Sequence, residues 1–126
     1  MIAQPLDPPL QPITEGHTFG GIKDISRRDT PEGGDPAPPA SPLARVEMVF
    51  APGTGCTGRK KVMISSDGDS PGITIDSPEN WEFSVAAQIL PLGPGRWNWL
   101  ISTEDSNTPP VRDPLLSGSL EIKSAP

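Results

Sequence analysis

Proline and glycine occur along almost the whole chain, and their spacing limits the available folds more than any other feature. The 126 residues include 18 prolines and 13 glycines, without the repeat that collagen requires. A proline inside a helix removes a backbone hydrogen bond and clashes with the preceding turn. Short strands joined by turns tolerate the same composition. The sequence therefore excludes a helical bundle.

Apolar and polar residues alternate from about residue 43 onward. In LARVEMVF (43–50), Val46, Met48 and Phe50 lie on one face, whereas Arg45 and Glu47 lie on the other. Similar strands are expected at 60–66, 72–76, 81–85, 96–103 and 116–123, and a first short strand within 13–25. The residues predicted to form the core are Phe19, Val46, Met48, Phe50, Ile73, Ile75, Trp81, Phe83, Trp97, Trp99, Ile101, Leu120 and Ile122.

Seven short strands separated by turns indicate an antiparallel β-sandwich or a small barrel. The number of strands favours an immunoglobulin-like sandwich, although the Cys–Trp–Cys spacing of true immunoglobulin domains is missing because Cys56 is the only cysteine. One helical turn is expected at Ala86–Leu90. We therefore predict an all-β domain at 13–126 with an immunoglobulin-like arrangement of about seven strands.

Two proline-rich segments lie outside this pattern. Residues 1–12 (MIAQPLDPPLQP) are expected to form an extended arm that cannot bury itself. Its apolar residues Ile2, Leu6 and Leu10 recur at every fourth position, which suits an arm ordered against another protein, and a frayed terminus is the alternative. Residues 27–42 are polar and proline-rich, and we expect a long mobile loop there.

Charge and hydropathy argue against two classes of partner. The formal net charge is −6 and the cations form no continuous stripe, so we expect no nucleic-acid partner. No apolar run approaches the roughly 20 residues that a membrane-spanning helix needs, and the first residues do not resemble an export signal. We therefore expect a protein made in the cytoplasm, with no membrane partner.

Two patterns resemble ligand-binding motifs without matching them. The stretch 53–60 has the glycine spacing of a phosphate-binding loop, but Arg59 stands where that loop has lysine. Asp67 and Asp69, with Asp76 nearby, resemble a cation-binding loop, although a tight turn explains them more simply. A weak calcium site stays open as an alternative. We predict no cofactor and no metal.

Catalytic or sugar-binding sites are also difficult to assemble from this sequence. His17 is the only histidine, and Cys56 would need it to form a catalytic pair, so we predict that the chain is not an enzyme. Trp81, Trp97 and Trp99 are candidates for stacking on sugars, but their alternation with aliphatic residues is more typical of a core. A host-glycan-binding module is the alternative that exposed tryptophans would favour.

Five short motifs follow one another in a notable order. They are ITEGHTFGGI (13–22), RVEMVF (45–50), GITI (72–75), ILPLGPGRWNWLIST (89–103) and LLSGSLEI (115–122). In this order they resemble small structural domains of tailed bacteriophages, similar to the N-terminal domain of the siphophage upper baseplate protein and to tail-fibre attachment modules. The resemblance implies an immunoglobulin-like sandwich with no catalytic residues that docks onto other virion proteins.

These observations together predict a non-enzymatic virion structural protein. We expect it in the tail or baseplate, where the sandwich and the N-terminal arm would contact neighbouring virion proteins in a symmetric assembly. Capsid decoration is the alternative within the same class. The predicted location is the virion.

Overall fold

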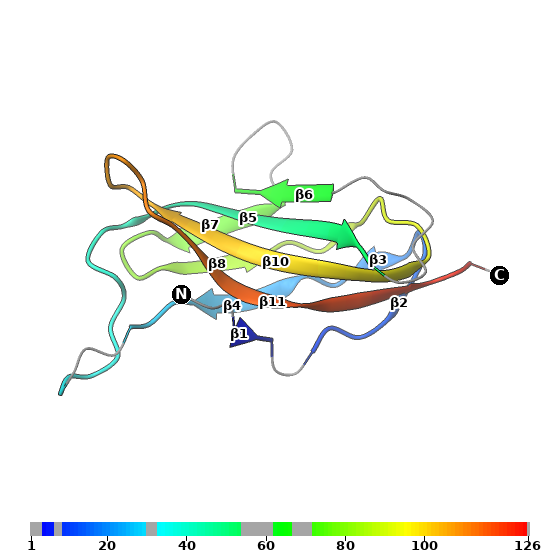
Figure 1. The fold of residues 1–126 in the computed structure, drawn as a ribbon, viewed down its shortest axis with the longest axis horizontal. Helices are drawn as coiled ribbons and strands as arrows, with labels where there is room; N and C mark the ends of the chain where they lie inside the picture. The colour runs from blue at the N-terminus through cyan, green and yellow to red at the C-terminus, as the bar shows by residue number, and fades with distance from the viewer. Residues whose placement is uncertain (1–3, 7–8, 30–32, 54–61, 67–71, 126) are drawn as a thin grey trace.

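The chain folds into two facing β-sheets and a short strand pair, as seen in a computed structural model that describes residues 4–6, 9–29, 33–53, 62–66 and 72–125 (Figure 1). The described residues contain no helix. The larger sheet has the spatial order β1 (Gln4–Pro5), β11 (Arg112–Lys123), β10 (Gly95–Asp105), β5 (Leu43–Pro52) and β6 (Val62–Ser65), and β2 (Ile13–Thr14) also pairs with β11. The smaller sheet has the order β4 (Ile22–Ser26), β8 (Glu82–Val85) and β7 (Ile73–Ser77), and the separate pair is β3 (Thr18–Phe19) with β9 (Gln88–Ile89). The predicted all-β class is confirmed.

One hydrophobic core lies between the sheets. Alternate residues of β10, namely Trp97, Trp99 and Ile101, point into it and are at most 3% exposed. Of the residues predicted to form the core, Ile75 is partly buried and all the others are buried. Leu43, Leu90, Leu92, Ile25, Ile64 and Val85 are also buried in this core.

The centre of the core depends on a close contact between β10 and β11. Trp99 lies directly opposite Gly118 in the antiparallel pairing of the two strands. A Cβ atom on Gly118 would lie only 2.8 Å from Cζ2 of the indole ring. Glycine at this position therefore lets the ring lie flat against the neighbouring backbone.

Residues 86–90 do not form the helical turn that we expected. Instead, β9 pairs with β3, with Thr18 opposite Ile89 and Phe19 opposite Gln88. A short apolar run does not distinguish a helical turn from a strand by itself. The prediction was wrong because the backbone groups of this run are paired with a strand far away in the sequence.

The first predicted strand, within 13–25, is divided into three short strands, β2, β3 and β4. Gly21 lies between the last two with a positive φ of 82°. A Cβ atom there would lie 2.3 Å from the carbonyl oxygen of Val85. The division therefore occurs at a residue whose conformation and close backbone contact both favour glycine.

The N-terminal segment is bound to its own domain. β1 runs parallel to β11, with Gln4 opposite Leu116, and the backbone N–H of Leu6 donates to the carbonyl oxygen of Ser117 at 3.4 Å. Leu6 and Leu10 are partly buried against the core. The expectation that this arm cannot bury itself is therefore wrong for the described part. Without β1, this side of β11 would be a sheet edge, and a proline-containing strand is able to pair at such an edge. Ile2 lies outside the described residues.

The described part of the proline-rich segment 27–42 is attached to the domain at several points. Asp29 and Ala37 exchange two backbone hydrogen bonds, of 2.7 and 2.9 Å. The carbonyl oxygen of Ser41 accepts a hydrogen bond from Nε1 of the buried Trp81 at 2.7 Å. The bonds between Asp29 and Ala37 join two parts of the segment itself, whereas the bond from Trp81 attaches its end to the domain.

Substitution of Gly118 tests the contact with Trp99. We expect Gly118→Ala to lower the free energy of unfolding by about 1–3 kcal/mol, because the added methyl group overlaps the indole ring. Chemical denaturation would measure this loss. Gly20→Ala is the matched control, since nothing lies within 4 Å of a Cβ atom there. Equal stabilities for the two variants would contradict the packing of Trp99 on Gly118.

The side chain of Asp105 closes the connection between β10 and β11. Its charge provides a test of how the stability of the fold depends on pH. Its carboxylate accepts hydrogen bonds from the backbone N–H groups of Val111 (2.8 Å) and Asn107 (3.1 Å). These bonds, chiefly the one from Val111, lower the pKa of Asp105 below 3.8. A lowered pKa means that the charged carboxylate stabilises the fold at neutral pH, and that this contribution disappears as the pH falls through the folded-state pKa.

We therefore expect wild type to be more stable than Asp105→Asn at neutral pH, with the difference vanishing in acid. Denaturant unfolding at pH 7 and at a series of increasingly acidic pH values would measure this. A stability difference that is independent of pH would contradict the role of the charge.

Candidate functional site

Of the two residues considered for catalysis, only His17 lies in the described part of the structure. His17 is exposed, and its backbone N–H donates to the carbonyl oxygen of Thr14 at 3.0 Å. Cys56 lies outside the described residues, so the absence of a catalytic pair stays a prediction. Asp76, which is a candidate with Asp67 and Asp69 for a cation-binding loop, accepts a hydrogen bond from Oγ of Ser84 at 2.8 Å.

The candidate ligand-binding motifs lie mostly outside the described residues. This holds for Asp67 and Asp69, and for all of 53–60 except Gly53. Within the described ranges, no group of three or more His, Cys, Asp or Glu side chains is placed to hold a metal ion. A search of the same residues finds no helix with the length and hydropathy needed to cross a membrane.

The three tryptophans are core residues. Trp81 and Trp97 are 2% exposed and Trp99 is 3% exposed. Nε1 of Trp97 donates to the carbonyl oxygen of Gly93 at 2.9 Å, whereas Nε1 of Trp99 has no hydrogen-bond partner among the described residues. The premise of the glycan-binding alternative, exposed indole rings, is therefore not met.

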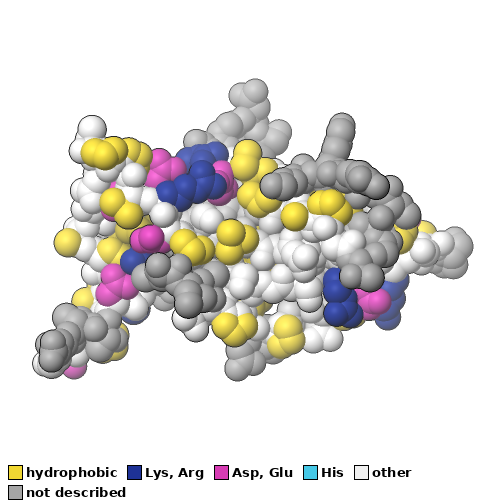
Figure 2. All heavy atoms as spheres, viewed as in Figure 1, with side chains coloured by type: hydrophobic (Ala, Val, Ile, Leu, Met, Phe, Trp, Pro, Cys, Tyr) yellow, Lys and Arg dark blue, Asp and Glu magenta, His cyan; other side chains and the backbone are white. Residues whose placement is uncertain are grey.

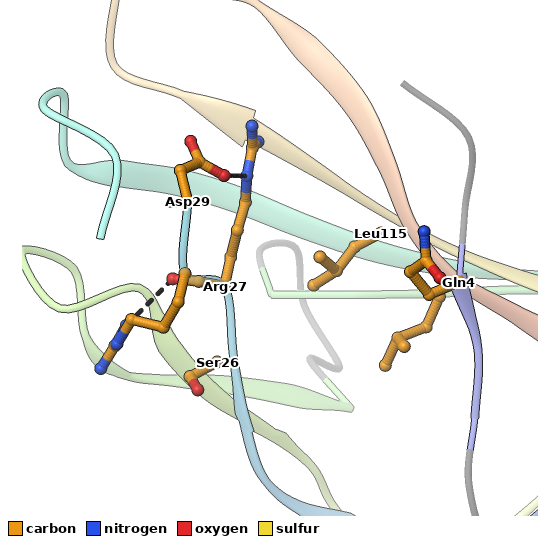
Figure 3. A pocket seen from close by; sticks show the side chains of 7 residues that line it. Gln4, Ser26, Arg27, Asp29 and Leu115 are labelled. Atoms are coloured by element: carbon orange, nitrogen blue, oxygen red, sulfur yellow. Dashed lines mark hydrogen bonds and ion pairs between the residues drawn. The ribbon is translucent and has the colours of Figure 1, made fainter. Parts of the chain in front are cut away.

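A pocket of about 340 Å³ opens where β1, β11 and the end of β4 meet (Figure 3). Figure 3 shows Arg27 and Asp29 on one side of it, and Gln4 and Leu115 on the other. The full lining consists of Gln4, Ser26, Arg27, Arg28, Asp29, Leu115 and Leu116. The pocket therefore separates the N-terminal strand from the start of the proline-rich segment.

Arg27 holds one wall of this pocket in place. Its Nε lies 3.3 Å from Oδ1 of Asp29, and its Nη1 lies 3.3 Å from Oδ2 of Asp113 on β11. The guanidinium also lies 5.1 Å from the centroid of the Trp81 ring, a cation–π distance. Arg27 thus connects the two sheets, a role that the sequence did not reveal because Asp113 and Trp81 are far away in the chain.

The most distinctive surface is the outer face of the larger sheet, formed by the side chains of β5, β6, β10 and β11 that point away from the core. The pairing of the strands arranges these side chains in five rows across the sheet. In order along the strands, the rows are Arg45, Glu104 and Arg112; Ser65, Glu47, Ser102 and Pro114; Met63, Val49, Leu100 and Ser117; Ala51, Asn98 and Ser119; and Arg96 and Glu121.

The middle row of the outer face is apolar and accessible. Met63 is 58% exposed, Leu100 is 38% exposed, and Val49 lies half-buried between them. Figure 2 shows hydrophobic side chains between groups of charged ones on the face turned to the viewer. Contiguous exposed apolar side chains with a polar rim are typical of surfaces that bind another protein.

A hollow of about 300 Å³ lies beside this row. Its lining includes Val49, Ala51, Asn98, Leu100, Ser102 and Arg112. The hollow combines an apolar floor with an amide and a guanidinium at its rim. It is suited to an apolar side chain from a docking protein.

A cluster of charged side chains lies at one end of the same face. Glu47 has a side chain only 5% exposed, and its carboxylate is 2.8 Å from Nη1 of Arg45. Arg112 reaches from β11 to the other oxygen of this carboxylate. The sequence correctly predicted that Arg45 and Glu47 share the outer face. The pairing of β11 with β10 adds Arg112 to this cluster, and the folded structure shows that Glu47 is buried.

Comparison with known proteins identifies no relative, since no protein-family model, curated protein or solved structure matches the chain. The function is therefore argued from the geometry of the surface.

Replacement of the Glu47 cluster tests whether its charges compensate one another. We expect Arg45→Met with Arg112→Met to lower the free energy of unfolding by about 3 kcal/mol, because a buried carboxylate is left uncompensated. Adding Glu47→Met should restore most of the stability, since three apolar side chains of similar length replace the charges. Chemical denaturation of both variants would measure this. A triple variant as unstable as the double variant would contradict the compensation.

Proposed function

We propose that this chain is a non-enzymatic structural protein of a tailed bacteriophage virion, which docks onto neighbouring proteins through the outer face of its larger sheet. The observation that carries the proposal is the row of Met63, Val49 and Leu100, which stays accessible at the centre of a sheet face. Exposed apolar side chains in such a position lose hydration when a partner covers them. The tail or baseplate is the favoured location, and capsid decoration is the alternative.

We also propose that the fold is an immunoglobulin-like sandwich. In an immunoglobulin fold, strands G, F, C and C′ form one sheet, and B, E and D belong to the other. The order β11, β10, β5, β6 and the order β4, β8, β7 agree with this arrangement when the strands are read in chain order. The agreement supports the immunoglobulin-like topology in addition to the observed all-β class.

The N-terminal arm has a smaller part in this proposal than the sequence alone indicated. Leu6 and Leu10 are partly buried against the core of their own domain, so only part of each side chain is accessible to a neighbour. The docking role is therefore assigned to the sheet face and not to these two leucines.

Incorporation into virions tests the proposal. Particles would be assembled in infected cells that supply the chain as wild type, as Leu100→Glu, or as Ile89→Glu. We expect wild type to be present in purified particles and Leu100→Glu to be reduced about tenfold or more, because a charge is placed in an apolar contact. Quantitative mass spectrometry of the particles would measure the amounts.

Ile89→Glu is the matched control, because Ile89 is 63% exposed but lies on β9, outside the outer face. It should be incorporated as wild type is. Failure to find the wild-type chain in purified particles would contradict the virion role. Separation of heads from tails before the measurement would distinguish the tail from the capsid location.

A further inference from the structure

We infer that the outer face binds a second copy of this chain, face to face, about a two-fold axis that crosses the strands through the row of Met63, Val49 and Leu100. This inference rests on the proposed docking role of the same face and names its partner. It follows from the positions of the charged residues relative to that row.

The charges along β10 are complementary about this axis. The axis lies between the two copies and runs perpendicular to the strands at the level of Leu100. Rotation about it places β10 of one copy over β10 of the other, with the two strands running in opposite directions. Residues at equal distances on either side of Leu100 then meet. Arg96 and Glu104 are each four positions from Leu100, and both point to the outer face. Arg96 of one copy therefore faces Glu104 of the other, and the same contact occurs twice.

The charges along β11 are complementary about the same axis. Arg112 is paired with Glu104 and Glu121 is paired with Arg96 in the antiparallel ladder. The same axis therefore brings Arg112 of one copy opposite Glu121 of the other. The Arg112 side chain is 54% exposed even though it contacts Glu47, so its outward surface is accessible to a second carboxylate. Opposite charges meet at both ends of the face.

Between the charged ends and the axis, Ser102 and Asn98 also lie at equal distances from Leu100. Asn98 is exposed whereas Ser102 is only 9% exposed, so the amide of Asn98 supplies most of the polar surface at these positions. At the axis itself, Leu100 meets Leu100 and Val49 meets Val49. The interface thus has an apolar centre and a polar rim, as protein interfaces commonly have.

An axis along β10 would not give this complementarity. It would place Arg96 against Arg96 and Glu104 against Glu104, so like charges would repel each other. The order of charges along the strand therefore distinguishes between two symmetric arrangements that the apolar row alone would allow.

The charge balance of the face favours a second copy as the occupant. The chain as a whole has a net charge of −6, so two copies repel each other over most orientations. The outer face is balanced, with Arg45, Arg96 and Arg112 against Glu47, Glu104 and Glu121. Two copies that meet through this face therefore add no local excess of like charge to the repulsion between the whole chains.

The size of the face predicts a reversible dimer. From residue 96 to residue 104, β10 covers about 27 Å, and four strands cover about 19 Å in width. The face is thus about 500 Å² per copy, or about 1,000 Å² for both, which is at the lower end of specific interfaces. Association should consequently depend on concentration.

Sedimentation velocity of the full chain tests this inference. Over about 10 µM to 1 mM protein, we expect wild type to shift from monomer towards dimer, as an interface of this size permits. Leu100→Glu and Leu100→Lys should each stay monomeric, because like charges meet at the axis. An equal mixture of the two should form a dimer, since opposite charges then meet. Ile89→Glu, on β9 of the separate strand pair, should dimerise as wild type does.

Three outcomes would overturn the inference. They are a wild-type chain that stays monomeric over the whole range, an Ile89→Glu variant that loses the dimer as Leu100→Glu does, and a charge-matched mixture that stays monomeric. Circular dichroism of each variant would show that it is folded. If the wild-type chain is monomeric but is still incorporated into virions, only the second copy as partner is contradicted. If the chain is missing from virions, the proposed function itself is contradicted.

Discussion

β10 pairs with a neighbour on each side, and both the core and the outer face follow from this pairing. β5 and β11 both pair with it over most of its length. Because strand residues alternate between the two faces, one strand then supplies both the indole rings of the core and the central residues of the outer face. Trp97, Trp99 and Ile101 hold the sheets together, while Asn98 and Leu100 lie on the surface. The position of the proposed docking surface is therefore set by the same register that fills the core.

The N-terminal segment solves a problem that this sheet would otherwise have. β11 would be a long edge strand with exposed backbone groups, which favours pairing with other chains. β1 and β2 pair with it in parallel, and Leu6 and Leu10 cover part of the adjacent core. Arg27 lines the pocket beside this edge and connects the end of β4 to Asp113 on β11. The two short strands cover this edge at residues 116–117 and 122–123, and the association that we propose uses the sheet face instead.

The outer face combines features that suit a structural protein. A buried carboxylate between arginines fixes the side chains at one end, and an apolar row next to a hollow lies at the centre. The rigid strands leave little conformational freedom to be lost when a partner binds. A weak contact of this kind becomes effective when it is repeated in a symmetric assembly.

Alternation in the sequence predicted the all-β class, the long strands of the two sheets and most of the core, because a period of two residues is a local property that does not depend on the partner strand. It also assigned Arg45 and Glu47 to the outer face. Three features became visible in the folded chain alone: residues 88–89 form a strand, the N-terminal segment pairs with β11, and Arg112 and Arg27 complete charged clusters. Each of these depends on a residue distant in the chain, and the alternation within one strand contains no information about which distant strand lies beside it.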